Sequence, residues 1–169
     1  MLICAKTFQE LDFDALMDVY LEGNRENGED LYPEKSPERQ LELALRDCEV
    51  YLRNEFFAIS DACYWIWSED GAYRSSLRLE PYQDGLLLEA LETHPEHRRK
   101  GYAKKLIFAV LERLPKGTRV YSHISKRNRP SLACHLACGF SKLLDYSVDA
   151  DGEIYDNQVT MCVTTNGNC

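Results

Sequence analysis

The sequence predicts a mixed α+β domain in which a mostly antiparallel central sheet is flanked by helices. Three observations support this fold class. Asp-Gly pairs at residues 70–71 and 84–85 separate three consecutive strand-like segments, as in antiparallel hairpins. A regular helical stripe of apolar residues follows them at residues 103–114. The chain has 169 residues, of which 44% are hydrophobic and 28% charged, so we expect residues 1–169 to form a single globular domain.

The first third of the chain predicts one strand and two helices. Residues 2–8 are typical of an edge strand, and apolar residues then recur at helical spacing over residues 11–21. Residues 22–35 carry five carboxylates and two glycines, so we expect a polar loop without regular structure throughout. A helix then begins at Ser36-Pro37-Glu38, because a capping hydroxyl, a proline and an early acid favour a helix start, and it should run to about Leu52.

The rest of the chain predicts most of the sheet and two further helices. Strands are expected at residues 64–67, 73–80 and 86–93, and the apolar run at 86–88 is typical of a central strand. After the helix at 103–114 come a strand at 118–125 and a short helix bracketed by Pro130 and Gly139. A final hairpin should pair residues 142–147 with residues 153–163.

Charge and cysteine content narrow the class of protein. The formal net charge of −8 argues against a nucleic-acid partner, because phosphate-binding faces normally leave a basic excess. No stretch approaches the length of a membrane span, and the first residues lack the apolar segment of a signal peptide, so we expect no membrane partner and a cytoplasmic location. Seven cysteines without paired spacing agree with a reducing compartment.

A basic, glycine-containing turn is the most informative segment. It lies between an apolar strand and an amphipathic helix and comprises Arg98, Arg99, Lys100, Gly101, Tyr102 and Ala103. Free backbone N–H groups and the positive end of the helix dipole favour an anion at a helix start, and three cationic side chains strengthen the attraction. In an acidic chain this block predicts a pyrophosphate site, the alternative being a solvated positive loop.

The order of these motifs resembles the acetyl-CoA-dependent N-acetyltransferase superfamily, known as GNAT. The likeness covers the whole predicted topology. Its specific part is a strand, the Arg-x-x-Gly-x-Ala turn, a long helix, a strand, Asn128, a short helix and Gly139-Phe140. The resemblance implies an acyl-CoA N-acyltransferase-like fold with three α/β/α layers, acetyl-CoA as co-substrate, and direct transfer of the acetyl group to a primary amine. Homodimers are common in that family.

The resemblance also implies a cofactor-binding set. In this family the strand before the turn splays from the next strand, and the pantetheine arm of coenzyme A fills the gap. Backbone N–H groups from Arg99 to Lys104 would then face the pyrophosphate, main-chain groups of Leu91 and Thr93 would bond the pantetheine amides, and the Asn128 side chain would contact the arm. Asn128 is also a natural helix cap, and the two roles are compatible. The full set is Leu91, Thr93, Arg98, Arg99, Lys100, Gly101, Tyr102, Ala103, Lys104 and Asn128.

Acetyl transfer needs a base for the amine and an acid for the leaving thiolate. Where the family commonly has a tyrosine, four residues before Gly139, this sequence has His135. Its imidazole is suited to protonate the sulfur near neutral pH, or it is a structural histidine bonded to the main chain. For the base, Glu92 lies near the expected bulge of the cofactor strand, with Glu89 and His123 as further candidates. Which strand face looks toward the acceptor stays open.

We expect no metal ion. His94 and His97 offer two ligands, but the flanking arginines make a poor cation site. Cys134 and His135 are adjacent on a helix and point about 100° apart, so they do not form a nucleophile and base pair. Cys134 and Cys138 are expected to be a packing pair.

The acceptor is the least determined part of the hypothesis. Carboxylates in residues 22–35 would attract a cationic amine of a small molecule or peptide, unless they form only a solvated loop. Four aromatic residues could instead line a pocket for an apolar acceptor or pack in the core: Tyr32, Tyr64, Trp65 and Trp67. The leading hypothesis is an acetyl-CoA-dependent N-acetyltransferase. The alternatives are a non-catalytic acyl-CoA-binding or sensing module, and an interaction domain whose basic turn docks an acidic partner.

Overall fold

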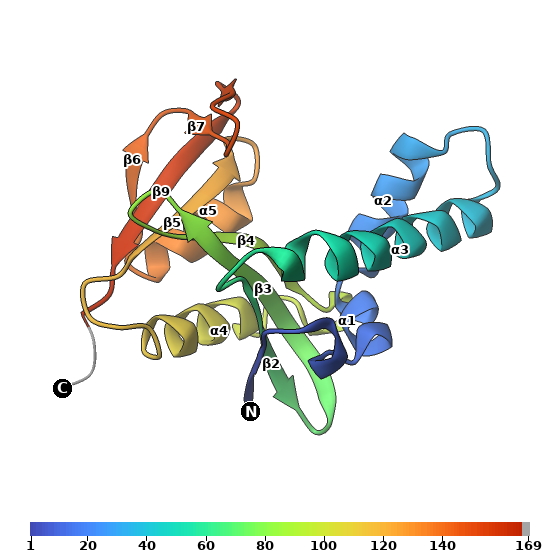
Figure 1. Ribbon diagram of the computed structural model, residues 1–169, viewed down its shortest axis with the longest axis horizontal. Coiled ribbons are helices and arrows are strands. Elements are labelled where there is room, and N and C mark those ends of the chain that lie inside the picture. The colour runs from blue at the N-terminus through green and yellow to red at the C-terminus, as the bar shows by residue number, and fades with distance from the viewer. Residues whose placement is uncertain (167–169) are drawn as a thin grey trace.

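A central sheet of seven strands runs through the computed structural model, which describes residues 1–166 (Figure 1). The strand order is β1 (Leu2–Ala5), β2 (Cys63–Glu69), β3 (Ala72–Tyr82), β4 (Gly85–Thr93), β5 (Arg119–Ser125), β9 (Gln158–Thr164) and β6 (Ser141–Leu144). All neighbouring strands in this sheet are antiparallel except β4 and β5, which pair in parallel. The predicted mixed α+β class with a mostly antiparallel sheet is therefore confirmed.

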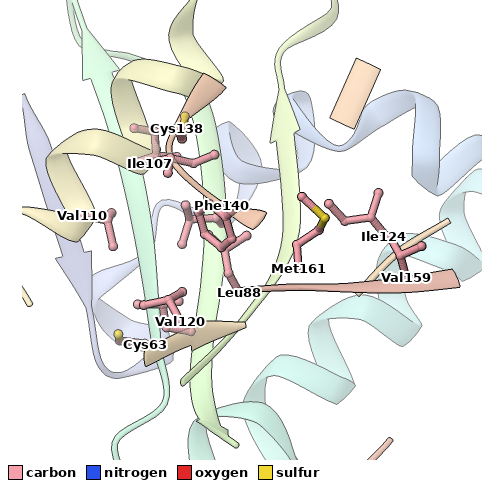
Figure 2. Close-up of a cluster of buried hydrophobic side chains, with 13 residues drawn as sticks. Cys63, Leu88, Ile107, Val110, Val120, Ile124, Cys138, Phe140, Val159 and Met161 are labelled. Carbon is pink, nitrogen blue, oxygen red and sulfur yellow. The ribbon is translucent and has the colours of Figure 1, made fainter. Parts of the chain in front are cut away.

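Helices cover both faces of the sheet. On one face lie α4 (Tyr102–Leu111) and α5 (Arg129–Ala137), which enclose a core around Leu79, Leu88 and Ile107 (Figure 2). On the other face lie α1 (Phe13–Val19) and α3 (Pro37–Asn54), which close a second core over β1 to β3. This arrangement gives the three layers that the resemblance implied. Short 3₁₀ turns occupy Phe8–Glu10, Phe56–Ala58 and Pro95–His97. None of the helices in the described part of the chain is long and apolar enough to cross a membrane.

The segment from residue 22 to residue 35 corrects the sequence analysis, because most of it is a helix rather than an irregular loop. Helix α2 spans Leu21–Leu31 and packs against α3, and the pair projects from the sheet as an arm (Figure 1). A Cβ at Gly28 would lie 2.6 Å from the Gln40 carbonyl oxygen, so this glycine allows the two helices to approach closely. Gly28 therefore reflects tertiary packing, which its sequence neighbours do not reveal.

Element ends differ from the prediction in three further places. The first strand stops at Ala5 because Thr7 starts a 3₁₀ turn, in which the Thr7 N–H donates to the Glu10 carboxylate at 3.1 Å. The first helix is shorter than residues 11–21, because Asp12 caps it by accepting a 3.1 Å hydrogen bond from Ala15 N. In the last hairpin β6 pairs with β9, but residues within its turn form a separate ribbon of β7 (Ser147–Val148) and β8 (Ile154–Tyr155). Cys169 lies outside the described residues.

Strands β4 and β5 are joined only at their beginning. The paired residues are Leu86 with Val120 and Leu87 with Tyr121. A Cβ at Gly85 would lie 2.1 Å from the Arg119 carbonyl oxygen, so the absence of a side chain lets the strands approach here. Beyond Leu87 the two strands share no further ladder pair in the described chain, and they separate toward the start of α4.

Candidate active site

A cavity of about 180 Å³ lies where β4 and β5 separate. Its walls come from β4, from β5 and from α5 with its preceding loop, through Leu88, Glu89, Ala90, Leu91, Ser122, His123, Ile124, Ser125, Asn128, Ser131 and His135. Leu88 and Ile124 belong to the core beneath α4. Successive residues of a strand point to opposite faces, so Glu89 and His123 point to the other face of the sheet. Because consecutive residues of both strands line it, the cavity lies between the strands and is bounded by groups from both faces of the sheet.

A bulge in β4 decides which carboxylates share a face. Arg78 of β3 lies opposite Glu89, but Ser76 lies opposite Glu92, so β4 contains one extra residue between these pairs. Ala90 takes up the irregularity with a φ of 48°, and its carbonyl oxygen accepts a hydrogen bond from the Tyr20 hydroxyl. The extra residue resets the alternation of side chains. Glu89 and Glu92 therefore lie on the same sheet face, the one shared with Ser76 and Arg78.

His135 has the main-chain hydrogen bond of a structural histidine, and its other ring nitrogen has no partner among the described residues. It is 1% exposed, and its Nδ1 donates a 2.9 Å hydrogen bond to the carbonyl oxygen of Ser131, one turn earlier in α5. This bond places the proton on Nδ1 and leaves Nε2 as an acceptor, which has no partner among the described residues. Burial lowers the pKa of His135, so the ring is neutral near pH 7. His135 thus lines the cavity, and its catalytic role stays a prediction.

His123 lies on β5 at the opposite side of the cavity. Its Nε2 is buried without a hydrogen-bond partner in the described chain, and its ring packs edge-on against Tyr82 with centroids 5.2 Å apart. Burial lowers the pKa of His123, and this outweighs the charges of Glu89 and Asp149, which raise it. A neutral imidazole at this position can accept a proton.

Of the three residues predicted to contact the pantetheine arm, Asn128 and Leu91 line the cavity and Thr93 does not. Asn128 lines the cavity and also caps α5, because its Oδ1 accepts a 3.1 Å hydrogen bond from Ser131 N. Leu91 lines the cavity from β4. Thr93 does not line it, and its N–H donates to the Glu92 carboxylate at 3.2 Å.

The basic turn has the backbone geometry of an anion site. Arg99 (φ 64°) and Gly101 (φ 83°) are both left-handed, and such turns can align successive N–H groups around a concave surface. The first hydrogen bond of α4 runs from Lys105 N to the Gly101 carbonyl oxygen at 3.0 Å. The N–H groups of Tyr102, Ala103 and Lys104 consequently have no acceptor within the helix.

The cations of the turn differ in their availability. Arg98 is held by two carboxylates, Glu22 of α2 and Glu92 of β4, the latter at 3.2 Å. Lys100 donates to the Glu96 carbonyl oxygen at 3.1 Å. Arg99 and Lys104 form no ion pair with the residues that the structure describes, so their charges are free for an external anion.

The model of the Acetyltransferase (GNAT) family matches residues 25–140, which is more than half of the chain. The chain belongs to the GNAT acetyltransferase family. No curated protein matches it at a significant level. The family assignment agrees with the separated strands and with the basic turn at the start of α4.

Solved structures of N-acetyltransferases align over nearly the whole chain. The PaiA N-acetyltransferase of Thermoplasma acidophilum in complex with coenzyme A is 17% identical with a TM-score of 0.62, covering 97% of this chain and 99% of that one. The spermidine N-acetyltransferase of Vibrio cholerae, in complex with CoA and spermine, is 18% identical with a TM-score of 0.57, covering 97% and 95%. The ribosomal-protein-S18-alanine N-acetyltransferase of Escherichia coli is 14% identical with a TM-score of 0.55, covering 100% and 97%. At these identities the likeness shows the fold.

This GNAT protein brings one further cluster of possible ligands together outside the cavity. Ligand atoms of His94, Glu96 and His97 lie within 4.8 Å of one another. Both ring nitrogens of His97 have cationic neighbours, however, because the Arg74 guanidinium contacts Nε2 and the Lys100 ammonium lies 3.3 Å from Nδ1. Adjacent positive charges disfavour a metal ion here.

Sequence reasoning missed a group of residues on the face that Glu89 shares. Tyr20 holds the bulge, and burial raises its pKa to about 12. Ser76 is fully buried, and its hydroxyl has no partner in the described chain. Arg78 forms a 3.1 Å ion pair with Glu89. A polar residue at every second position of an otherwise apolar strand, as at 76, 78 and 80, is the signal that could have indicated them.

Proposed function

We propose that this acetyltransferase transfers an acetyl group from acetyl-CoA directly to a primary amine of a small molecule or peptide. The observation that carries the proposal is the cavity between β4 and β5, which combines unpaired histidine nitrogens with free backbone N–H groups at the nearby start of α4. Coenzyme A has both an anionic end and an extended amide-containing arm, so it requires both features.

The binding of coenzyme A is assigned to backbone and side-chain groups of the turn and the cavity. N–H groups from Arg99 to Lys104 face the pyrophosphate, and the unpaired charges of Arg99 and Lys104 add attraction. The pantetheine arm lies along Leu91 and Asn128. Thr93 contributes only if its N–H leaves the Glu92 carboxylate.

For the transfer step the protein must supply a base for the amine and an acid for the leaving thiolate. The amine nitrogen forms a bond to the thioester carbon, the C–S bond breaks, and its electron pair stays on sulfur, which then takes a proton. His135 presents an unprotonated Nε2, so it first accepts a proton before it can deliver one to the thiolate. The base that removes the proton of the amine is Glu92 or His123.

Two measurements test this function. Calorimetry of the purified protein with coenzyme A should show binding, and free-thiol detection with acetyl-CoA and a panel of primary amines should show turnover. Binding without thiol release for any amine would favour the non-catalytic acyl-CoA-binding module. An absence of binding would refute both. A cytoplasmic location and a homodimer stay predictions, to be checked by localisation in cells and by light scattering.

A further inference from the structure

Arg78, Glu80 and Glu89 lie on the face of the sheet that α1 and α3 partly cover. Arg78 and Glu89 are paired across β3 and β4, with Nη2 and Oε2 3.1 Å apart and side chains 19% and 33% exposed. Glu80 lies two residues from Arg78 on the same strand face. Burial raises the pKa of Glu80, and the charge of Glu89 raises it further. Glu89 is the carboxylate that forms an ion pair with the Arg78 guanidinium.

Glu89 is the member of this group that reaches the cavity. Its Oε2 binds Arg78, whereas its Oε1 accepts no hydrogen bond from the residues that the structure describes. The same cavity is lined by His123, with a buried and unpartnered Nε2, and by His135, which is almost fully buried and also has an unpartnered Nε2. Buried polar atoms normally have partners, so the two histidine nitrogens indicate a polar ligand in the cavity that the partly exposed Glu89 also lines.

Glu92 is less available than Glu89 to bind a ligand in the cavity. Its Oε1 already accepts from Thr93 N and from Arg98, each at 3.2 Å, and Arg98 is tied in turn to Glu22. Glu92 does not line the cavity. Binding an amine at Glu92 would therefore require the Arg98 contacts to break.

We propose that Glu89 binds the ammonium group of the acceptor and that His123 takes its proton, with Arg78 holding the Glu89 carboxylate in position. The inference rests on the proposed function and specifies its acceptor site. A cationic amine would bind at Glu89 Oε1, the carboxylate oxygen that Arg78 does not contact. A neutral acceptor of the same shape would form only an uncharged hydrogen bond with Glu89 Oε1 and would bind less tightly.

The proton balance of the step is complete. The ammonium loses one proton to the neutral His123 ring, and the ring later returns it to solvent. The free amine then attacks the thioester carbon, and the C–S bond breaks. The nitrogen loses a second proton, and the thiolate gains one proton, so the number of protons is conserved. No oxidant, reductant or metal enters the balance.

The charged and titratable groups around His123 predict its response to pH. Glu89 of β4 and Asp149 after β7 are the carboxylates whose charges act on it, and Tyr82 packs against the ring from β3. Burial lowers the pKa of His123 below 6.5, so kcat should fall only at acidic pH. Removing the Glu89 charge should move this acidic limb to a still lower pH, since the charge favours the protonated ring.

The experiment uses the primary amine that gives the fastest thiol release with the wild type. Glu89→Gln should raise the KM for this amine by about 10- to 100-fold, the size of a hydrogen bond to a charged group, and leave the KM for acetyl-CoA unchanged. His123→Gln should lower kcat by about 100-fold or more, with little change in the KM for the amine. Glu49→Gln removes a Glu–Arg ion pair on α3, with Arg53, and is the matched control that should change neither constant.

Two outcomes would overturn the inference and leave the proposed function standing. One is an unchanged KM for the amine in Glu89→Gln, and the other is the same amine-specific loss in Glu92→Gln instead. Calorimetric binding of coenzyme A by each variant shows that it is folded. If the wild type binds coenzyme A but releases no thiol with any amine, the proposed function fails, and the assignment of Glu89 fails with it.

Discussion

Gly85→Ala should loosen the point at which β4 and β5 are held together. The new Cβ would lie 2.1 Å from the Arg119 carbonyl oxygen, whereas ordinary contact begins at 3.4 Å, so the strands must move apart by about 1.3 Å. Overpacking of this kind costs about 1–3 kcal/mol. In a domain of this size each kcal/mol lowers Tm by about 2–4 °C, so we expect a fall of roughly 2–12 °C.

Thermal unfolding followed by circular dichroism measures this effect, and calorimetry with coenzyme A measures its consequence for the cavity. Binding should weaken in Gly85→Ala, because the cavity lies directly beyond the joined residues. The matched control is Gly23→Ala in α2, where a Cβ meets nothing within 4 Å. This change should raise stability by about 1 kcal/mol, as expected for alanine in a helix. A Tm of Gly85→Ala within about 1 °C of the wild type would refute the reasoning.

Three further predictions concern the turn, the bulge and the buried histidine. Arg99→Glu should weaken coenzyme A binding by about tenfold or more in calorimetry, whereas Arg113→Glu beyond the other end of α4 should not; equal losses would contradict a specific anion site. Tyr20→Phe should lower the free energy of unfolding by about 1–3 kcal/mol in urea titration, because the Ala90 carbonyl loses its donor, and an unchanged value would count against the bulge anchor. His135 has a lowered pKa in the folded state, so its contribution to stability is present above pH 6.5 and is lost as pH falls below it. Wild-type stability should therefore decline more steeply than that of His135→Gln between pH 7 and pH 5, and parallel slopes would be inconsistent with a buried neutral ring.

The sequence predicted those parts of the site that depend on residues only a few positions apart. The turn at Arg98 to Ala103 begins a helix because Gly101 adopts a left-handed conformation that favours glycine, and Asn128 caps the next helix from three residues away. The hydrogen bond of His135 to Ser131 is likewise within one helical turn. These features follow from spacing, and the sequence analysis could name them.

Features that depend on contacts between distant segments were not predictable in the same way. Gly28 suggested a loop, but it serves the crossing of α2 and α3 at Gln40. Strict alternation along β4 would have placed Glu89 and Glu92 on opposite faces, and only the pairing with β3 shows that they share one. The ion pairs of Arg98 with Glu22 and Glu92 join three segments, and no pattern in any one of them indicates the others.

The bulge at Ala90 changes which face of the sheet the later side chains of β4 occupy. If β4 kept all its residues but paired with β3 without this bulge, every later side chain would turn to the opposite face, so that Glu92 would point toward α4 while Glu89 kept its place. The bulge at this single position therefore decides which face the last side chains of β4 occupy, without altering any chemical group. The register of β4, as much as the identity of its residues, determines which carboxylates lie on each face of the sheet.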